Sequence, residues 1–476
     1  IIIHSSNMNI FLKTLSACAL AFAGFTHAEA QIEVYPVPQQ IYYAKHIDDY
    51  TVRVRQSGTK EWIDLYEYKV KVDMDTNSDA TMVQFGFSGS VDVLVEKNNG
   101  HIDDVCIRPL SRKIKARKDG NSIMFTLDKP EKLSIEFNGD RLHNLHLFAN
   151  AVSPAMPEAG QPGTMHFSAG YHVPQSPDKC FHIPSNTTVY IENGAIFKGP
   201  FVCDSVENVN IIGNGIVLET SNGMTISHSR NVTVDGLTFM NPRYNSITTA
   251  VSSDITLRNI KSFSSQGWGD GLDFFCCTNV TADSLFMRNS DDCIAIYGHR
   301  WDYYGNTSGI RITNSTLWAD IAHPVNIGTH GDTSHEGETL ENIEIKNIDI
   351  LEHDEDDPDY QGCIAINTGD HNLVRNVLVD GLRVEHIQEG QLFHLRVMFN
   401  KKYNTGPGRT IENVTFRNVS CSAPRLRPSL IEGYDSLNTV RNISFENIHL
   451  NGKKIKTLEK LNIKRANSFT SDITIK

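Results

Sequence analysis

The chain has 476 residues and a net charge of -12, with 39% hydrophobic and 21% charged residues. This composition is ordinary for a folded protein, so it excludes disorder as the main state of the chain. The acidic balance argues against nucleic acid as a partner, because phosphate binding needs an electropositive surface.

Residues 1–30 have the pattern of a short leader followed by a secretory signal peptide. Lys13 precedes an apolar run of small residues, and "AEA" ending at Ala30 fits an A-x-A cleavage site that leaves Gln31 as the mature start. The apolar run is too short to span a bilayer. We therefore expect an exported protein, secreted or periplasmic, without membrane insertion; a lipid anchor at Cys18 is the lesser alternative.

Residues 31–165 read as short segments in which apolar and polar residues alternate. Examples are "YTVRVRQ", "YKVKVDM", "VDVLVEK", "SIMFTLD" and "LSIEFNG". Period-two alternation with Gly, Asn and Asp between the runs is typical of half-buried antiparallel strands. The sequence therefore predicts a small antiparallel β-sandwich domain, and the Pro- and Gly-rich "NAVSPAMPEAGQPGTMHFSAG" after it predicts a connection.

Residues 166–476 repeat one pattern: a turn residue, an alternating strand, an Asn or Gly, and a second short strand. "VENVNIIGNGIVL", "SRNVTVDGLTFMN" and "VRNISFENIHLNG" are three of its copies. The spacing starts near 23 residues, as between Asn208 and Asn231, and lengthens later; such a period in a strand-rich chain indicates a solenoid. Leucine-rich repeats have a similar period, but they need a Leu-rich consensus and a helix, and this region has neither. We therefore expect an all-β fold in which residues 166–476 form a right-handed parallel β-helix.

Three asparagines in this region match the glycosylation sequon, namely Asn231, Asn279 and Asn413. A turn Asn followed by β-forming residues produces the same pattern without any glycan. We interpret these asparagines as structural turn residues.

Three acids interrupt the repeat pattern beside an apolar strand. Asp291 and Asp292 precede a run that includes Ile294 and Ile296, and Asp270 lies about one coil earlier. Because stacked strands lie about 4.8 Å apart, acids one coil apart at the same corner come close together. We expect the pair to lie at a strand entry, with both isoleucines directed inward.

Clustered carboxylates raise the pKa of at least one member, since like charges close together cannot all ionise cheaply. A protonated carboxyl beside an ionised one is what cleavage of a glycosidic bond requires: the acid protonates the leaving oxygen and the base activates water. Spacing alone leaves two other interpretations open, a calcium site built from the same oxygens and a solvated acidic turn.

The segments "GDGLDFF" and "NSDDCIAIYG" resemble the polygalacturonase family's "NTDG(I/F)D" and "GDDC(I/V)A(I/V)", and "IAHPVNIGTHG" resembles its "GHG(I/L)SIG". The resemblance covers about residues 180–450. It implies an inverting glycoside hydrolase on a right-handed parallel β-helix. In that reading Asp291 is the general acid, Asp270 and Asp292 activate water, and His323 tunes or positions them.

The sequence departs from that family at two places. Trp268 and Gly269 replace the Asn-Thr before the first acid, and the "RIK" element aligns with "CIAIN", so Ala365 and Asn367 stand where Arg and Lys bind a substrate carboxylate. An N-terminal sandwich instead resembles the dextranase and isopullulanase family, which cuts neutral α-glucans. The resemblance therefore leaves two substrate classes open.

Further cleft candidates surround the acids. The expected substrate-binding residues are Trp268, Asp273, Tyr297, His299, Arg300, Trp301 and Asn367. The His-rich loop "GTHGDTSHEGE" matches no ligand spacing, and the acidic run at 352–360 reads as a solvated loop. We expect no metal and no cofactor.

The leading functional prediction is an exported hydrolase acting within polysaccharide chains. A polysaccharide lyase is less favoured, because acids stand where a base would be needed. A non-catalytic carbohydrate-binding β-helix is also less favoured, since it would not require three acids at a one-coil interval.

Overall fold

The computed structural model describes residues 31–155, 160–358, 360–423, 426–465 and 467–476. The predicted signal peptide lies outside the described residues. Within those ranges, no helix is long and apolar enough to cross a membrane.

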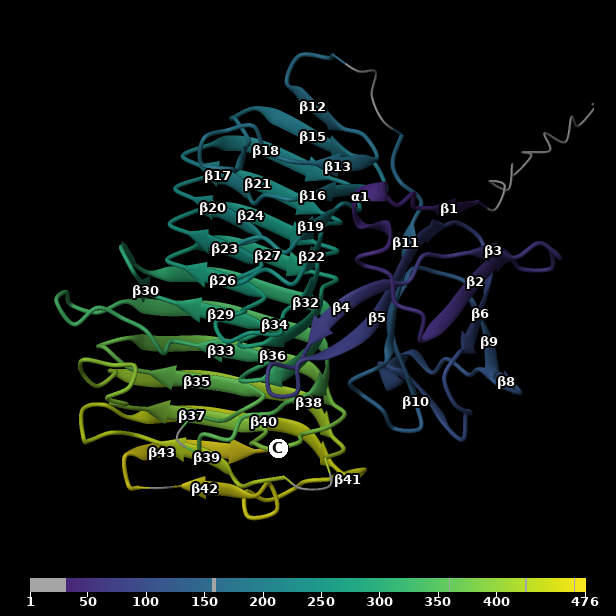
Figure 1. Cartoon of the computed structure of the whole chain (residues 1–476). Helices are drawn as coiled ribbons and strands as arrows, with labels where there is room; N and C mark the ends of the chain where they lie inside the picture. The colour runs from purple at the N-terminus through teal and green to yellow at the C-terminus, as the bar shows by residue number, and fades with distance from the viewer. Residues whose placement is uncertain (1–30, 156–159, 359, 424–425, 466) are drawn as a thin grey trace, which may run out of the picture.

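Two stacked sheets form a β-sandwich beside a larger solenoid (Figure 1). One sheet contains β1 (Ile32–Val34), β4 (Tyr68–Val72), β5 (Ser78–Phe87), β7 (Val105–Arg108), β10 (Glu131–Phe137) and β11 (Leu145–Ala151). The other contains β2 (Tyr50–Gln56), β3 (Ile63–Asp64), β6 (Val91–Lys97), β8 (Arg117–Asp119) and β9 (Ser122–Leu127). The short helices α1 (Gln39–Tyr42) and η1 (Leu110–Arg112) complete this part.

The sequence predicted an antiparallel sandwich, but one pair of its strands is parallel. β5 and β11 run parallel, with Leu145 opposite Thr81 and Ala151 opposite Phe87. β5 and β11 are not joined by a hairpin: the chain between them forms strands of both sheets, and β11 pairs with β10 in antiparallel fashion and with β5 in parallel. Alternation in the sequence predicts which side chains point inward, but it carries no information on strand direction.

The solenoid consists of two long parallel sheets whose strands alternate along the chain. In the described residues the larger sheet has nineteen strands: β12 (Thr164–Phe167), β13 (Gly170–His172), β15 (Thr187–Ile191), β16 (Ala195–Phe197), β18 (Glu207–Ile212), β19 (Ile216–Leu218), β21 (Arg230–Asp235), β22 (Thr238–Met240), β24 (Ser253–Arg258), β25 (Lys261–Phe263), β27 (Thr278–Asp283), β28 (Phe286–Ser290), β32 (Thr307–Ile321), β34 (Thr339–Glu352), β36 (Leu373–Val384), β38 (Thr410–Cys421), β40 (Val440–Leu450), β41 (Lys453–Lys454) and β43 (Thr470–Ile475). All of its pairs are parallel except the hairpin between β40 and β41.

The second solenoid sheet has eleven strands in the described residues, all paired in parallel with their neighbours. They are β14 (Phe181–His182), β17 (Phe201–Asp204), β20 (Met224–Ser227), β23 (Ile247–Ala250), β26 (Leu272–Phe275), β29 (Ile294–Tyr297), β33 (Val325–Ile327), β35 (Ile364–Thr368), β37 (Phe393–Val397), β39 (Ser429–Glu432) and β42 (Ile463–Arg465). Between β29 and β32 the chain forms a small hairpin of β30 (His299–Arg300) and β31 (Tyr303–Tyr304).

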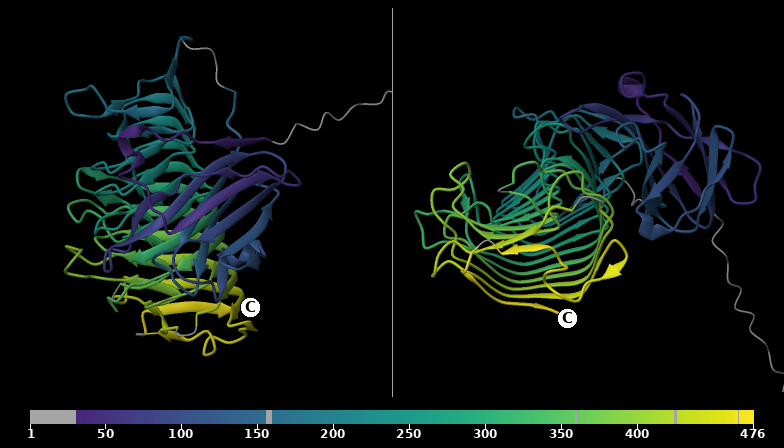
Figure 2. Two further views of the ribbon diagram at one scale, coloured as in Figure 1. Left: turned by 45° about the vertical axis from the view of Figure 1, so that its right-hand side comes forward. Right: turned by 90° about the horizontal axis from the view of Figure 1, so that it is seen from below.

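One continuous apolar core fills the space between the two solenoid sheets, which curl around it when viewed along the stack (Figure 2). Successive coils place apolar residues on top of one another; Val232, for example, lies opposite Ile255, which in turn lies opposite Val280. A single coil could not bury its own apolar face, so stacking of the coils supplies the core. The predicted all-β fold, a parallel β-helix preceded by a β-sandwich, is confirmed.

Candidate active site

The acid cluster lies where two successive coils enter the eleven-stranded sheet. β28 ends at Ser290 and β29 begins at Ile294, so Asp291 and Asp292 lie in the bend between these strands, as expected. The backbone N–H of Gly271 donates to the carbonyl of Asp292 (2.9 Å), which puts Asp270 opposite Asp292 on the preceding coil. One carboxylate oxygen from each of these three acids lies within 4.8 Å of the other two.

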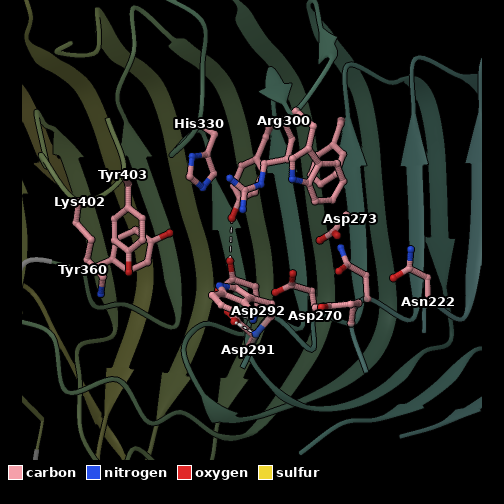
Figure 3. Close-up of a pocket in the computed structure, with 16 residues that line it drawn as sticks. Asn222, Asp270, Asp273, Asp291, Asp292, Arg300, His330, Tyr360, Lys402 and Tyr403 are labelled. Carbon is pink, nitrogen blue, oxygen red and sulfur yellow. Dashed lines mark hydrogen bonds between the residues drawn. The ribbon is translucent and has the colours of Figure 1, made fainter. Parts of the chain in front are cut away.

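A cleft of about 670 Å³ opens over these acids on the outer face of the eleven-stranded sheet (Figure 3). Eight expected residues line it: Trp268, Asp270, Asp273, Asp291, Asp292, Tyr297, Arg300 and Trp301. Eight others line it that the sequence did not indicate as binding residues: Asn222, Tyr244, Asn245, Phe275, His330, Tyr360, Lys402 and Tyr403. The cleft therefore reaches over coils well before and well after the acids.

Asp292 is surrounded by hydrogen-bond donors. Its Oδ1 accepts from His323 Nδ1 (2.7 Å), and its Oδ2 accepts from Asn326 Nδ2 (2.8 Å) and from the Tyr297 hydroxyl (3.0 Å). Burial alone would raise the pKa of Asp292, but the adjacent His323 and these hydrogen bonds outweigh burial and hold it below its usual value. Asp292 is thus the carboxylate that stays ionised.

Asp291 and Asp270 have the opposite electrostatics. Burial, followed by the charge of Asp292, raises the pKa of Asp291 to about 6, although the backbone N–H of Trp268 donates to its Oδ2 (2.7 Å). The pKa of Asp270 is raised well above its ordinary range, by burial first and by the charge of Asp291 next. The cluster therefore holds protons beside an ionised carboxylate.

Asp273 points into the cleft from β26 (Figure 3) and is buried, with only 1% of its surface exposed. Neither of its carboxyl oxygens has a hydrogen-bond partner within the protein. Burial and then the charge of Asp292 raise its pKa well above the ordinary value. A protonated carboxyl that faces the cleft without a partner is available to a ligand hydroxyl.

His323, expected among the catalytic residues to tune or position the acids, does not line the cleft but contacts Asp292, where that role would place it. Its ring is completely buried behind Asp292, where Nδ1 contacts the carboxylate and Nε2 lies 2.6 Å from the carbonyl oxygen of Tyr360. Burial would lower the pKa of His323, but the charge of Asp292 and the hydrogen bond to it raise the pKa to about 9. His323 therefore acts on Asp292 and cannot touch a substrate.

Asn367 is also placed differently from the expectation. It lies on β35 with none of its surface exposed, and it does not line the cleft. The following segment folds over this end of β35: the N–H of Met398 donates to the carbonyl of Thr368, and the N–H of Asp370 donates to that of Gly406. A motif alignment cannot predict this cover, which buries Asn367 and brings Lys402 to the cleft instead.

The cations of the cleft come from loops. Arg300, in the β30–β31 hairpin, and Lys402, in the loop after β37, both line it (Figure 3). His330 is close to Arg300, and burial followed by that positive charge lowers the pKa of His330 to about 4, so it is neutral. His299 faces away from this cleft, with Nδ1 2.8 Å from the carbonyl of Gly331 and Nε2 2.7 Å from that of Trp301, and it holds the hairpin in place.

Two groups of side chains in the described residues have potential metal-ligand atoms within 4.8 Å of one another. One is the acid cluster, but both oxygens of Asp292 are already engaged by N–H and O–H donors that a cation would have to displace. The other, Asp178 with Cys180 and His182, lies near the first coils, where His182 Nε2 is 2.7 Å from Asp178 Oδ2. Neither group has a feature that requires a metal.

The fold and the site define a parallel β-helix that carries a cluster of acid–base carboxylates in an elongated cleft. Residues 217–468, more than half of the chain, match the family model "Glycosyl hydrolases family 28". The chain belongs to this family.

Curated relatives match part of the chain. It is 25% identical over 235 residues to the probable endopolygalacturonase D of Neosartorya fischeri, covering 48% of this chain and 43% of that protein. It is also 25% identical over 179 residues to endopolygalacturonase B of Aspergillus niger, covering 36% and 43%. The matches therefore span less than half the length of these relatives.

Solved structures share the fold. Dex49A from Penicillium minioluteum has a TM-score of 0.61 at 15% identity, covering 93% of this chain and 96% of that one. The family 28 exopolygalacturonase of Yersinia enterocolitica has a TM-score of 0.51 at 13% identity, covering 86% and 95%. At such low identity, these similarities concern the fold alone.

Proposed function

We propose that the protein is an exported glycoside hydrolase that cleaves glycosidic bonds within polysaccharide chains, in the manner of a polygalacturonase. The observation that supports this most directly is an ionised Asp292 next to Asp291, whose pKa is raised to about 6. An acid that keeps its proton beside a base that has lost one is what glycosidic cleavage requires.

In this proposal Asp291 donates its proton to the leaving glycosidic oxygen. Asp292 accepts a proton from the attacking water, and Asp270 helps to orient that water. Of these last two, Asp292 is the stronger candidate base, because the raised pKa of Asp270 keeps that carboxyl protonated.

The stereochemical outcome is a separate part of the proposal. The resemblance to polygalacturonases favours inversion, yet inverting enzymes usually hold their carboxyl groups about 6.5–9.5 Å apart and retaining enzymes about 5–5.5 Å apart. Here the nearest oxygens of the three acids lie within 4.8 Å. Proton NMR of the first anomer released decides the matter: a retained configuration would identify one aspartate as a nucleophile.

The cleft favours a polysaccharide that carries carboxylates. Arg300 and Lys402 line it, and the pKa of Lys402 is raised, chiefly by a hydrogen bond with the side chain of Tyr403. The curated relatives are named endopolygalacturonases, which agrees with an acidic substrate. A neutral α-glucan is the second candidate, because Ala365 and Asn367 supply no cation on β35.

Reducing-end assays on polygalacturonate and on dextran test the proposal. Reducing ends should appear on polygalacturonate, with an early fall in viscosity for endo action and without the ultraviolet absorbance of an unsaturated lyase product. Asp291→Asn should abolish turnover. Activity on neither polymer, or full activity of Asp291→Asn, would contradict the proposal.

A pair of lysine variants distinguishes the two substrate classes. Lys402→Met should raise KM for polygalacturonate about tenfold to a hundredfold, since a hydrogen bond between charged groups contributes about 1.5–3 kcal/mol. Its neighbour Lys401 is exposed and does not line the cleft, so Lys401→Met is the matched control. An unchanged KM in Lys402→Met, together with activity on dextran, would favour the neutral glucan.

Export is tested by N-terminal sequencing of the secreted protein, which should begin at Gln31.

A further inference from the structure

Tyr360 lies at the end of an acidic loop between β34 and β35, in a run that the sequence indicated only as a solvated loop. The structure instead places it against the back of the acid cluster, with 8% of its surface exposed. Its ring packs edge-on against His323, with centroids 4.5 Å apart, and faces Tyr403 at 5.0 Å. Both polar groups of Tyr360, its backbone carbonyl and its hydroxyl, connect to Asp292 through one intermediate residue each.

The backbone carbonyl of Tyr360 determines the protonation of His323. A carbonyl oxygen can only accept a hydrogen bond, so Nε2 of His323, 2.6 Å away, must carry a proton. The other ring nitrogen, Nδ1, lies 2.7 Å from Asp292 Oδ1. With an acceptor on each side, the ring donates from both nitrogens and is an imidazolium paired with Asp292.

The hydroxyl of Tyr360 determines the orientation of Asn326. Asn326 Nδ2 donates to this hydroxyl (2.6 Å), the hydroxyl lies 3.1 Å from Thr329 Oγ1, and Thr329 Oγ1 donates to Asn326 Oδ1 (3.0 Å). This closed triangle fixes which edge of the amide carries the N–H groups. The remaining N–H of Asn326 consequently points at Asp292 Oδ2, 2.8 Å away, and at the Tyr297 hydroxyl beside it, 3.1 Å away.

We propose that Tyr360 is a positioning residue that keeps Asp292 oriented and ionised, acting on one carboxylate oxygen through His323 and on the other through Asn326. The inference rests on the proposed function, in which Asp292 is the base. It gives Tyr360 a role beyond that of a cleft wall on which a sugar could stack.

Other charged and titratable groups also face Asp292, so their contributions must stay constant in any test. They are Asp270, Asp273, Asp291, Cys293, Tyr297, His323, His330, His353 and Glu355. Tyr360→Phe leaves all of these in place and keeps the carbonyl and the ring. It removes only the hydroxyl, which opens the triangle and weakens the restraint on the amide of Asn326, although Thr329 still donates to its oxygen.

The test compares Tyr360→Phe with wild type on the substrate that wild type cleaves. We expect kcat to fall about tenfold with KM within about twofold, as for a loss confined to the chemical step. The acidic limb of the kcat profile should move to higher pH, because Asn326 donates less firmly to Asp292 and the pKa of Asp292 rises. Tyr434, an exposed tyrosine, supplies the control Tyr434→Phe, which should behave as wild type.

A double-mutant cycle shows whether Tyr360 acts through Asn326. If it does, Tyr360→Phe should have little further effect in an Asn326→Ala background. Additive effects, or a rise in KM with unchanged kcat and unchanged acidic limb, would overturn the proposal and leave Tyr360 as a wall of the cleft. If Tyr360→Phe fails to fold, Thr329→Val opens the same triangle and should shift the acidic limb in the same direction.

A measurement without substrate separates this inference from the proposed function. The lowered pKa of Asp292 stabilises the fold above the unfolded pKa of an aspartate, and this contribution is lost as pH falls through the folded pKa. Tyr360→Phe should therefore lower Tm more at neutral pH than at strongly acidic pH. A deficit that is equal at both pH values would contradict the role of Tyr360 even if wild type hydrolyses polysaccharide.

Discussion

Asp292 keeps its charge in a buried site because three side chains donate hydrogen bonds to its carboxylate, and one of them is the positively charged imidazolium of His323. That charge raises the pKa of Asp291 in addition to the effect of burial. One donor-rich carboxylate therefore makes its neighbour an acid. Two chemically identical side chains, adjacent in sequence, acquire different roles from the atoms that surround them.

The pH dependence of turnover should reflect this division. We expect kcat/KM to fall as pH rises through about 6, where Asp291 loses its proton, and to fall on the acidic side only below the range in which an ordinary aspartate titrates, where Asp292 gains a proton. Initial rates across this range provide the measurement, and circular dichroism at each pH provides the control for unfolding. An alkaline limb near 9 would instead assign the loss to the imidazolium of His323.

At the residue scale, the sequence could predict what the backbone repeat fixes. The one-coil interval places Asp270 beside the pair, with Asp292 rather than Asp291 directly opposite it. The sequence predicted Arg300 as a cleft residue but not Tyr360 or Lys402, which reach the cleft from loops whose paths do not follow the repeat. The sequence also could not predict how deeply a side chain is buried: His323 matches a motif histidine, yet it lies completely buried behind the acids.

At the scale of single elements, asparagines with a left-handed backbone occupy the second position of strands β18, β21 and β27. Asn208, Asn231 and Asn279 have backbone φ angles of 57°, 54° and 58°, a left-handed conformation that Asn tolerates better than other residues with a Cβ. Their side chains also bond along the stack: Asn231 Nδ2 donates to Asn208 Oδ1 at 2.8 Å, and Asn208 Nδ2 donates to Asn186 Oδ1 at 2.9 Å. The three sequon asparagines Asn231, Asn279 and Asn413 all have this conformation, as a structural role requires, but they lie inside strands β21, β27 and β38 and not in turns.

Substituting one ladder asparagine separates these two contributions. Asn231→Ala should lower the free energy of unfolding by about 1.5–3.5 kcal/mol, from about 1–2 for the left-handed conformation and about 0.5–1.5 for the hydrogen bond. Asn231→Gly keeps the conformation and loses only the bond, so its loss should be clearly smaller. Denaturant unfolding measures both values. Equal losses for the two variants would show that backbone conformation contributes little.

At the scale of the whole molecule, an apolar cluster joins the sandwich to the solenoid, in addition to the core that each unit has of its own. Apolar side chains of the sandwich such as Val70 and Phe148 pack with solenoid residues such as Phe263 and Trp318 in one buried cluster. The sequence indicated which residues of each unit alternate inward. It could not indicate that outward residues of the solenoid face the sandwich, because alternation predicts a face and does not identify its partner.

Hydrogen bonds fix this junction close to the active site. Arg288 is completely buried on β28, where its Nε lies 2.9 Å from Asp320 Oδ2 and its Nη1 donates to Asn144 Oδ1 in the sandwich (2.8 Å). Three residues further along the chain is Asp291. The N–H of Met74, in the turn after β4 of the sandwich, also donates to Ser290 Oγ (3.0 Å). The sandwich therefore supports the strand that leads into the acid pair.

Because the apolar cluster and the hydrogen bonds of Arg288 and Met74 cross the junction, the two units should unfold together. Calorimetry of residues 31–476 should show one transition, and Arg288→Met, which leaves Asp320 buried without its partner, should destabilise that whole transition by about 3–5 kcal/mol. Arg230 supplies a matched control, since its exposed pair with Glu207 (3.1 Å) contributes about 0–1 kcal/mol, so Arg230→Met should change Tm little. Two separate transitions in wild type, or an Arg288→Met variant with unchanged Tm, would show that the sandwich is an independent appendage. Activity of Arg288→Met below its Tm then measures how far the acid pair depends on the junction, and we expect kcat to fall with KM little changed.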